Sequence, residues 1–324
     1  MRCSIPLFLL FFLFIGCVEQ PAETSTSTTA TALNSSTTST SLPAGGFRLH
    51  EWGVLAGCPE SESFFLTSRP KQLYLVEQPV IYVHADDNLS FDLTVVFNAG
   101  KPTDTYPVVP VEESGVVEWN NVRIVDDCSK VREVKDVGFI PLEDILDTLA
   151  DVDSACLEVN GVRERFLFYE GEIEYVNKIS AIYDLSTGTA TLTNNGEYPV
   201  YNLMLIVSSV GEAPFSPQVH SALIDELKAG EQAQLILSDK TIDSSVLEGD
   251  MMSLGFTQKE ADSFASLWAD SFFRPTNQPG YVNLIYRISE QEYDRLISLK
   301  VSPRPRQMIR SLYVLVDLSD QSDG

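Results

Sequence analysis

Short stretches in which apolar and polar residues alternate, separated by turn residues, run through most of this chain. Residues 47–55 alternate up to Trp52-Gly53, and residues 91–97 do the same before the turn at Asn98-Ala99-Gly100. Alternation with a period of two puts every second side chain on one face of a strand, and many short strands with frequent turns are typical of sandwiches. The sequence therefore predicts a mainly β fold, an antiparallel β-sandwich, from residue 47 onward.

The same reasoning assigns the remaining elements. Further strands are expected at residues 73–76, 80–83, 106–111, 115–125, 163–175, 178–184, 189–193, 198–207, 233–237, 281–288 and 308–318. A hairpin turn is expected at Asn194-Asn195-Gly196, since both central positions tolerate positive φ. Helices are expected at residues 142–150, 218–228, 244–254 and 290–297. Because helices gather late in the chain, we expect a β-sandwich-rich domain at 47–210 and a smaller α+β C-terminal part at 211–324, packed on it.

One further helix has a recognisable start. Thr257-Gln258-Lys259-Glu260 is a capping box, in which the first and fourth side chains bond each other's backbone N–H groups. The apolar residues that follow have helical spacing, which predicts a core-facing stripe. They are Ala261, Phe264, Ala265, Trp268 and Phe272.

The first 46 residues indicate export. Arg2 precedes an apolar run at 5–15 that ends in Gly16-Cys17, as in a signal peptide at 1–16 followed by a lipobox cysteine. Phe14 stands where leucine is usual in such motifs. The eleven apolar residues would span about 16–17 Å as a helix, against roughly 30 Å of hydrocarbon, which argues against a transmembrane anchor. We therefore expect lipidation at Cys17 and a membrane partner through that lipid.

A Ser/Thr-rich segment follows, so residues 17–46 are expected to form a disordered tether. Fourteen of the 18 residues at 24–41 are Ser or Thr, which cannot bury a core. Asn34 and Asn88 stand in sequons and are candidates for glycosylation. The expected location is the outer face of the cytoplasmic membrane or the cell surface.

Charge excludes one class of partner. The chain has 22 Lys and Arg against 46 Asp and Glu, a net charge of −24. Such a surface repels nucleic acid, so no nucleic-acid partner is expected. Acids are spread along the chain rather than gathered in a tail, which is typical of a folded acidic surface.

Three cysteines remain after the signal and the lipidated residue. Cys58, Cys128 and Cys156 allow one disulfide with three pairings. Cys128 and Cys156 are the favoured pair because they flank the same strand–helix unit. CxxC spacing is absent, so the sequence supports neither a zinc nor a redox centre of that kind.

The dipeptide His50-Glu51 is the strongest candidate for a catalytic or metal-binding site. A histidine beside a carboxylate can act as an acid–base pair or supply metal ligands. Neighbours on a strand point to opposite faces, however, so His50 would need His84 or His220 and an acid such as Asp86. The alternative is a structural role for both residues. Because HxH and HExxH spacings are absent, the sequence assigns no catalytic residue, no metal site and no cofactor.

The other charged residues are explained most simply as surface residues. Asp86-Asp87 and Asp126-Asp127 follow strands, where Ca²⁺ ligands can lie, but the DxDxDG pattern is missing and solvated loop acids are favoured. Arg304 and Arg306 form the one basic spot. We expect them to pair with surface acids or to position the last strand.

Several blocks together resemble a known group of proteins. Phe47-Arg48-Leu49-His50-Glu51-Trp52-Gly53 is similar to the opening of a family of exported prokaryotic proteins that begin with an HEWG motif. Similar blocks follow at 78–84, 95–100, 165–171, 193–196, 260–273 and 303–305, while 274–280 departs from the family pattern. The resemblance implies a shared fold and an exported life. It implies no activity, cofactor or site residue.

Two functions remain open. The first is a lipid-anchored cell-surface protein that acts as a non-catalytic binding or envelope-assembly module, with an envelope protein or a glycan as partner. The alternative is an extracytoplasmic hydrolase, metal-dependent or not, that uses His50 and Glu51 with an acid from another strand. A histidine beside a concave pocket, with an acid within hydrogen-bond reach, would favour the enzyme.

Overall fold

The computed structural model describes residues 46–57, 72–111, 114–132, 142–211 and 217–319. The signal peptide 1–16, Cys17, the tether up to residue 45, Asn34 and Cys58 lie outside the described residues. None of the helices in the described residues is long and apolar enough to cross a membrane.

The described strands form three sheets. Sheet A consists, in spatial order, of β12 (Pro217–Leu227), β11 (Val200–Val210), β14 (Val282–Ile288), β16 (Gln307–Asp317), β1 (Phe47–Gly57), β2 (Gln72–Ala85), β8 (Phe166–Tyr175) and β4 (Gly100–Tyr106). Sheet B consists of β15 (Ile297–Ser302), β3 (Ser90–Phe97), β5 (Val116–Val125), β6 (Cys156–Val159) and β7 (Val162–Glu164). Sheet C consists of β13 (Gln232–Ile236), β10 (Thr189–Asn194) and β9 (Ile179–Asp184).

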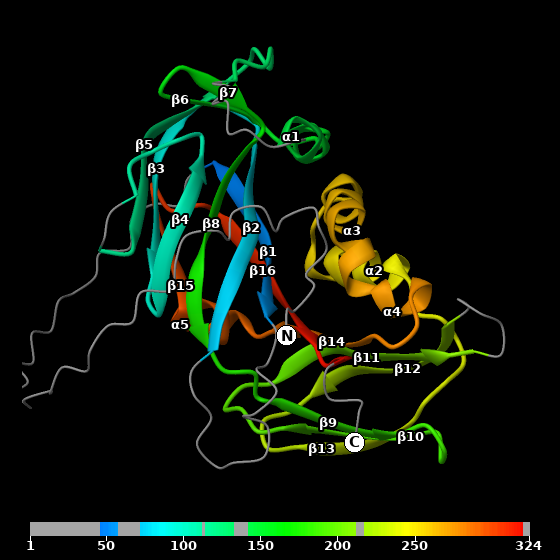
Figure 1. The fold of residues 1–324 in the computed structure, drawn as a ribbon. Coiled ribbons are helices and arrows are strands. Elements are labelled where there is room, and N and C mark those ends of the chain that lie inside the picture. The colour runs from blue at the N-terminus through cyan, green and yellow to red at the C-terminus, as the bar shows by residue number, and fades with distance from the viewer. Residues whose placement is uncertain (1–45, 58–71, 112–113, 133–141, 212–216, 320–324) are drawn as a thin grey trace, which may run out of the picture.

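Sheet A is the middle layer of the molecule (Figure 1). One face packs against sheets B and C through a large apolar core that includes Leu49 and Ile81. The other face packs against helices through a second core that includes Trp52 and Tyr82. The helices on this second face are α1 (Leu142–Ala150), α2 (Ser244–Leu254), α3 (Gln258–Phe272) and α4 (Arg274–Asn277). Helix α5 (Glu290–Leu296) lies on the first face, where its Tyr293 and Leu296 belong to the large core. Burial on both faces explains why β1 is almost continuously buried from Leu49 to Ala56.

The mainly β prediction is confirmed, together with helices towards the C-terminal end. The capping box at Thr257 forms, and the stripe from Ala261 to Phe272 is buried. The helix expected at 218–228 is wrong: this segment is β12, which pairs with β11 along its length. Its local pattern fits a helix, and pairing between strands decides the outcome.

Three other local expectations need correction. The strand expected at 106–111 largely fails, since β4 ends at Tyr106 and only an isolated bridge at Val111 follows. Asn194-Asn195-Gly196 forms a turn, with Gly196 N donating to Asn194 Oδ1 at 2.8 Å, but it leads from sheet C into sheet A and closes no hairpin. The strands β6 and β15 were not expected.

The expected boundary at residue 210 falls between two strands that pair with each other. β11 and β12 are hydrogen-bonded neighbours in sheet A. The same sheet joins β1 to β16 in parallel, so both ends of the folded part meet at its centre. Sheet A therefore draws strands from both proposed parts.

The structure joins Cys128 and Cys156 by a disulfide, the pair that the sequence favours, with 5.3 Å between their Cα atoms. The bond closes a loop with a sequence separation of 28, for which chain entropy gives about 3.5 kcal/mol of stabilisation. We expect a Cys128→Ser/Cys156→Ser variant to lose about that much free energy of unfolding, measured by denaturant titration. A matched Cys58→Ser variant, which keeps the bond, should unfold like the wild type; equal losses in both would contradict this role.

Candidate metal centre

The pairing of β1 with β2 brings two histidines together. His50 on β1 lies opposite Tyr82 on β2, and Arg48 lies opposite His84. Residues two apart on a strand share a face, so His50 and His84 are diagonal neighbours on the same face of sheet A. Their ring centroids are 4.5 Å apart. His84 is therefore the second histidine that His50 was expected to need.

The acid that joins them comes from a helix. Glu260 is the fourth residue of the capping box, and its Oε2 accepts a hydrogen bond from Thr257 N at 2.7 Å. The buried stripe that starts at Ala261 holds α3 against the helical face of sheet A. This docking turns the Glu260 side chain, which is fully buried, towards the two rings.

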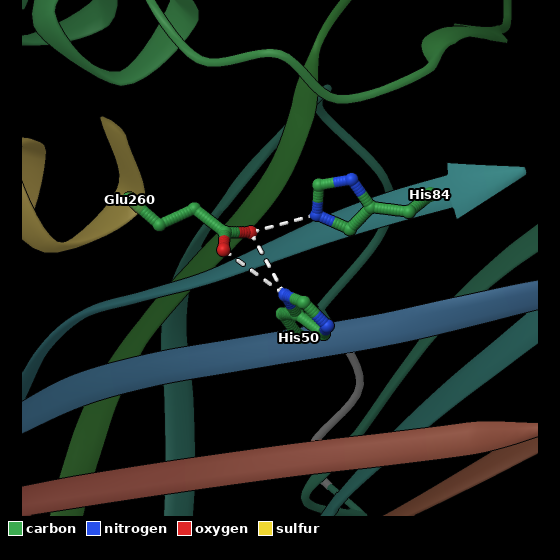
Figure 2. Close-up of side chains that lie close together, drawn as sticks. All are labelled: His50, His84 and Glu260. Atoms are coloured by element: carbon green, nitrogen blue, oxygen red, sulfur yellow. Dashed lines mark hydrogen bonds and ion pairs between the residues drawn. The ribbon is translucent and has the colours of Figure 1, made fainter. Parts of the chain in front are cut away.

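The three side chains form one compact cluster (Figure 2). His50 Nδ1 lies 3.1 and 3.0 Å from the two carboxylate oxygens of Glu260, and His84 Nε2 lies 2.9 Å from Oε1. All the potential ligand atoms lie within 4.8 Å of one another. The His50 ring also packs edge-on against Phe256, at 5.5 Å between centroids. His50 Nε2 is buried with no hydrogen-bond partner in the described residues, so Glu260 is the ring's polar contact there.

The hydrogen bonds keep Glu260 ionised. Burial alone would raise the pKa of this carboxyl, but hydrogen bonds from His50 and His84 and the charge of His50 outweigh it and lower the pKa to about 2. A carboxylate only accepts, so the two facing ring nitrogens carry protons in this arrangement. A cation could replace those protons. Two imidazole nitrogens and one carboxylate are the donor set of a catalytic type of zinc site.

The separations suit a small metal ion. Bonds of 2.0–2.2 Å in tetrahedral geometry place neighbouring ligand atoms about 3.4 Å apart. The nitrogen–oxygen separations of 2.9–3.1 Å in the cluster are close to that value. Small rotations of the side chains would complete the fit.

One member of the cluster reaches solvent. The His84 side chain is 9% exposed, whereas those of His50 and Glu260 are 1% and 0% exposed. His84 also lines an open pocket of about 700 Å³. The cluster therefore borders the pocket through His84, while His50 and Glu260 lie in the core.

Glu51 does not belong to this site. It lies on the opposite face of β1, where Tyr169 Oη donates to its Oε1 at 2.6 Å. Arg310, its register partner on β16, forms a buried ion pair with it. The hypothesis that His50 and Glu51 share one site is therefore wrong, because neighbouring residues on a strand point to opposite faces of the sheet.

The remaining candidates are dispersed. His220 lies on the edge strand β12 and pairs with Asp239 at 2.8 Å. Asp86 is exposed and lines the pocket, but it is not part of the cluster. Asn88 is exposed and donates to Asp126 at 3.1 Å. Asp127 pairs with Arg163 at 2.6 Å, so these loop acids have protein partners.

Glu260 is the residue that sequence reasoning missed. The capping box explained its presence without any further role, and it lies 210 positions from His50. A capping glutamate normally faces solvent or its own helix end. The one available signal was its place immediately before the buried stripe, which puts it at the edge of the core-facing side of α3.

Comparisons with known proteins add little here. Neither a protein-family model nor a curated protein sequence matches the chain, so the resemblance to the HEWG family stays a prediction. A solved structure of the yeast delta-COP-I mu-homology domain, complexed with a Dsl1 WxWxV peptide, aligns over 85% of this chain and 96% of its own. It shares 10% identity with a TM-score of 0.27, and no inference is drawn from it.

Proposed function

We propose that this chain is an exported protein that binds one divalent transition-metal ion, best matched by zinc, through His50, His84 and Glu260, and that it acts as an extracytoplasmic hydrolase. The observation that supports the proposal is the meeting of these three ligand atoms, from β1, β2 and α3, beside an open pocket. This is the metal-dependent form of the hydrolase alternative, with Glu260 in place of Glu51.

The donor set favours catalysis over a purely structural metal. Structural zinc sites use four protein ligands, whereas catalytic sites use three and leave one position open. The described residues supply three, and one of these, His84, also lines the pocket. In such a site the metal supplies Lewis-acid activation of water near neutral pH. The protein's part is to hold the two rings and the carboxylate in place.

Metal analysis of the full-length chain, purified in mild detergent without chelators, tests this proposal. We expect about one zinc per chain in the wild type, and visible absorption typical of tetrahedral coordination after exchange for cobalt. His50→Ala and His84→Ala should each lose the ion. His220→Ala is the matched control, since that histidine pairs with Asp239 elsewhere, and it should retain the ion. A wild type that takes up neither metal refutes the proposal.

The location belongs to the same proposal. We propose lipid anchoring at Cys17, on the outer face of the cytoplasmic membrane or the cell surface. The disulfide between Cys128 and Cys156 supports export, because such bonds persist in oxidising compartments. Mass spectrometry of the native protein should find a mature chain that begins with a lipid-modified Cys17. An intact residue 1 or an unmodified Cys17 would refute the anchoring.

A non-catalytic binding module is the second candidate, and one surface favours it. Ile182 on β9 and Ile236 on β13 are 73% and 82% exposed on sheet C. Among the strands that the structure describes, each of these two pairs with β10 alone in sheet C, which leaves its other edge available to contact an envelope protein or glycan. Envelope pull-downs should lose any specific partner in an Ile182→Asp/Ile236→Asp variant. Equal capture by both forms would exclude this surface.

A further inference from the structure

The pocket beside His84 lies where the folded part begins. Its wall includes Gly46 and Arg48 at the start of β1, His84 at the end of β2, and Arg306 just before β16. Arg306 is held there by its backbone N–H, which donates to Phe47 O at 2.8 Å. Two arginines and His84 of the metal cluster therefore line the same pocket at one end of sheet A.

Register fixes Arg48 next to the cluster. Arg48 lies directly opposite His84 on one side and opposite Gln307 on the other. Directly opposed side chains on neighbouring strands lie about 5 Å apart at Cβ. An anionic group bound by Arg48 would therefore lie within reach of a metal held by His84.

These two arginines differ from most others in the protein. Acidic residues outnumber basic ones by 46 to 22, yet both guanidinium groups lack an acidic partner in the part of the chain that the structure describes. Six other arginines form ion pairs there: Arg123, Arg132, Arg163, Arg287, Arg295 and Arg310. The expectation that Arg306 pairs with a surface acid is thus not met among these residues.

The acids in the wall only partly offset this positive charge. Asp86 and Asp153 also line the pocket. Asp153 already accepts a hydrogen bond from Lys259 at 3.1 Å. Lys259 also lies 3.8 Å from Asp151, so it is shared between two acids. Asp86 and Asp153 have no arginine partner among the described residues, and the two guanidinium groups of the wall therefore stay available to a ligand with an anionic group.

We propose that this pocket binds the oxyanion group, carboxylate or phosphate, of a small substrate through Arg48 and Arg306, next to His84 of the metal site. The statement about the metal rests on the proposed function, whereas the anion site stands on its own residues. Arginine suits either oxyanion because its planar fork donates two parallel hydrogen bonds. The substrate class is therefore a small anionic molecule.

Calorimetric titration of the full-length chain in detergent, zinc-loaded and zinc-free, tests the proposal with inorganic phosphate and succinate as probes. We expect at least one probe to bind, and an Arg48→Ala/Arg306→Ala variant to bind it at least about tenfold more weakly with unchanged zinc content. Arg304→Ala is the matched control: this arginine is exposed on the same segment but outside the pocket wall. If only phosphate binds, the substrate group is a phosphate; if only succinate binds, it is a carboxylate.

The outcomes separate the two proposals. A zinc-containing wild type that binds neither probe, or a double variant that binds as well as the wild type, overturns the anion site and leaves the metal site standing. A wild type without zinc that still binds a probe through the two arginines supports the anion site and refutes the metal-dependent function.

Discussion

Replacing Arg310 with alanine should lower the free energy of unfolding by about 3–5 kcal/mol, because it leaves the buried carboxylate of Glu51 without its cation. Both side chains are at most 1% exposed, and they form an ion pair between register partners of β1 and β16. Arg310 Nη1 also donates to Ile297 O at 3.1 Å, and its guanidinium stacks 3.9 Å from the Tyr293 ring centroid. One side chain thus links sheet A to α5 and β15.

Denaturant titration and thermal melting measure the effect. The melting temperature should fall by roughly 6–20 °C, given about 2–4 °C for each kcal/mol in a domain of this size class. Arg304→Ala, an exposed arginine on the segment before β16, is the control and should change the free energy of unfolding by at most about 0.5 kcal/mol.

A double variant separates the loss of the pair from the loss of volume. Glu51→Gln/Arg310→Met removes both charges and keeps apolar volume, so it should recover much of the stability that Arg310→Ala loses. Tyr169 can still donate to the amide oxygen that replaces the carboxylate. An Arg310→Ala variant within about 1 kcal/mol of the wild type would show that water reaches Glu51 and that the pair is not buried in solution.

Local patterns carried much of the fold prediction. Alternation located most strands, and the Thr257 capping box and its apolar stripe located α3, because these signals lie within a few residues of one another. The opposite faces of His50 and Glu51 also follow from alternation alone. The structure adds that Trp52 and Gly53, which follow His50 and Glu51, have packing roles. Trp52 packs against Phe264 of α3 at 5.2 Å between ring centroids, and a Cβ on Gly53 would lie 3.0 Å from Pro79.

Pairing over long sequence distances could not be predicted in the same way. The parallel contact of β1 with β16 joins residues about 260 positions apart, and nothing local to either strand encodes it. The candidate site depends on such contacts twice: β2 supplies His84 and α3 supplies Glu260. A ligand set with one residue on each of three elements has no spacing signature, unlike HExxH on one helix. The missing motif therefore did not exclude a metal site.

Glu260→Gln should abolish zinc binding while leaving the fold intact, and this contrast tests the double role of the residue. Glutamine can still close a capping box with Thr257, so the start of α3 should form as before. It cannot supply the carboxylate charge, and we expect zinc affinity to fall by at least about 100-fold. The measurement is zinc titration with melting followed in parallel. In the wild type, zinc at 100 times its dissociation constant should add about 2.7 kcal/mol of stability.

Glu260→Ala completes the comparison, because it removes the cap and the ligand together. We expect it to lose zinc and a further amount of about 1 kcal/mol that zinc cannot restore. Of the three proteins, only the wild type should therefore be stabilised by added zinc. Without zinc, the Glu260→Gln variant should be more stable than the Glu260→Ala variant. If Glu260→Gln kept the zinc-dependent rise in melting temperature, Glu260 would be a helix cap that orients two histidines, and the ligand set would have to be sought elsewhere. If it loses that rise and keeps the fold, the start of one helix serves both as a cap and as a ligand of the metal centre.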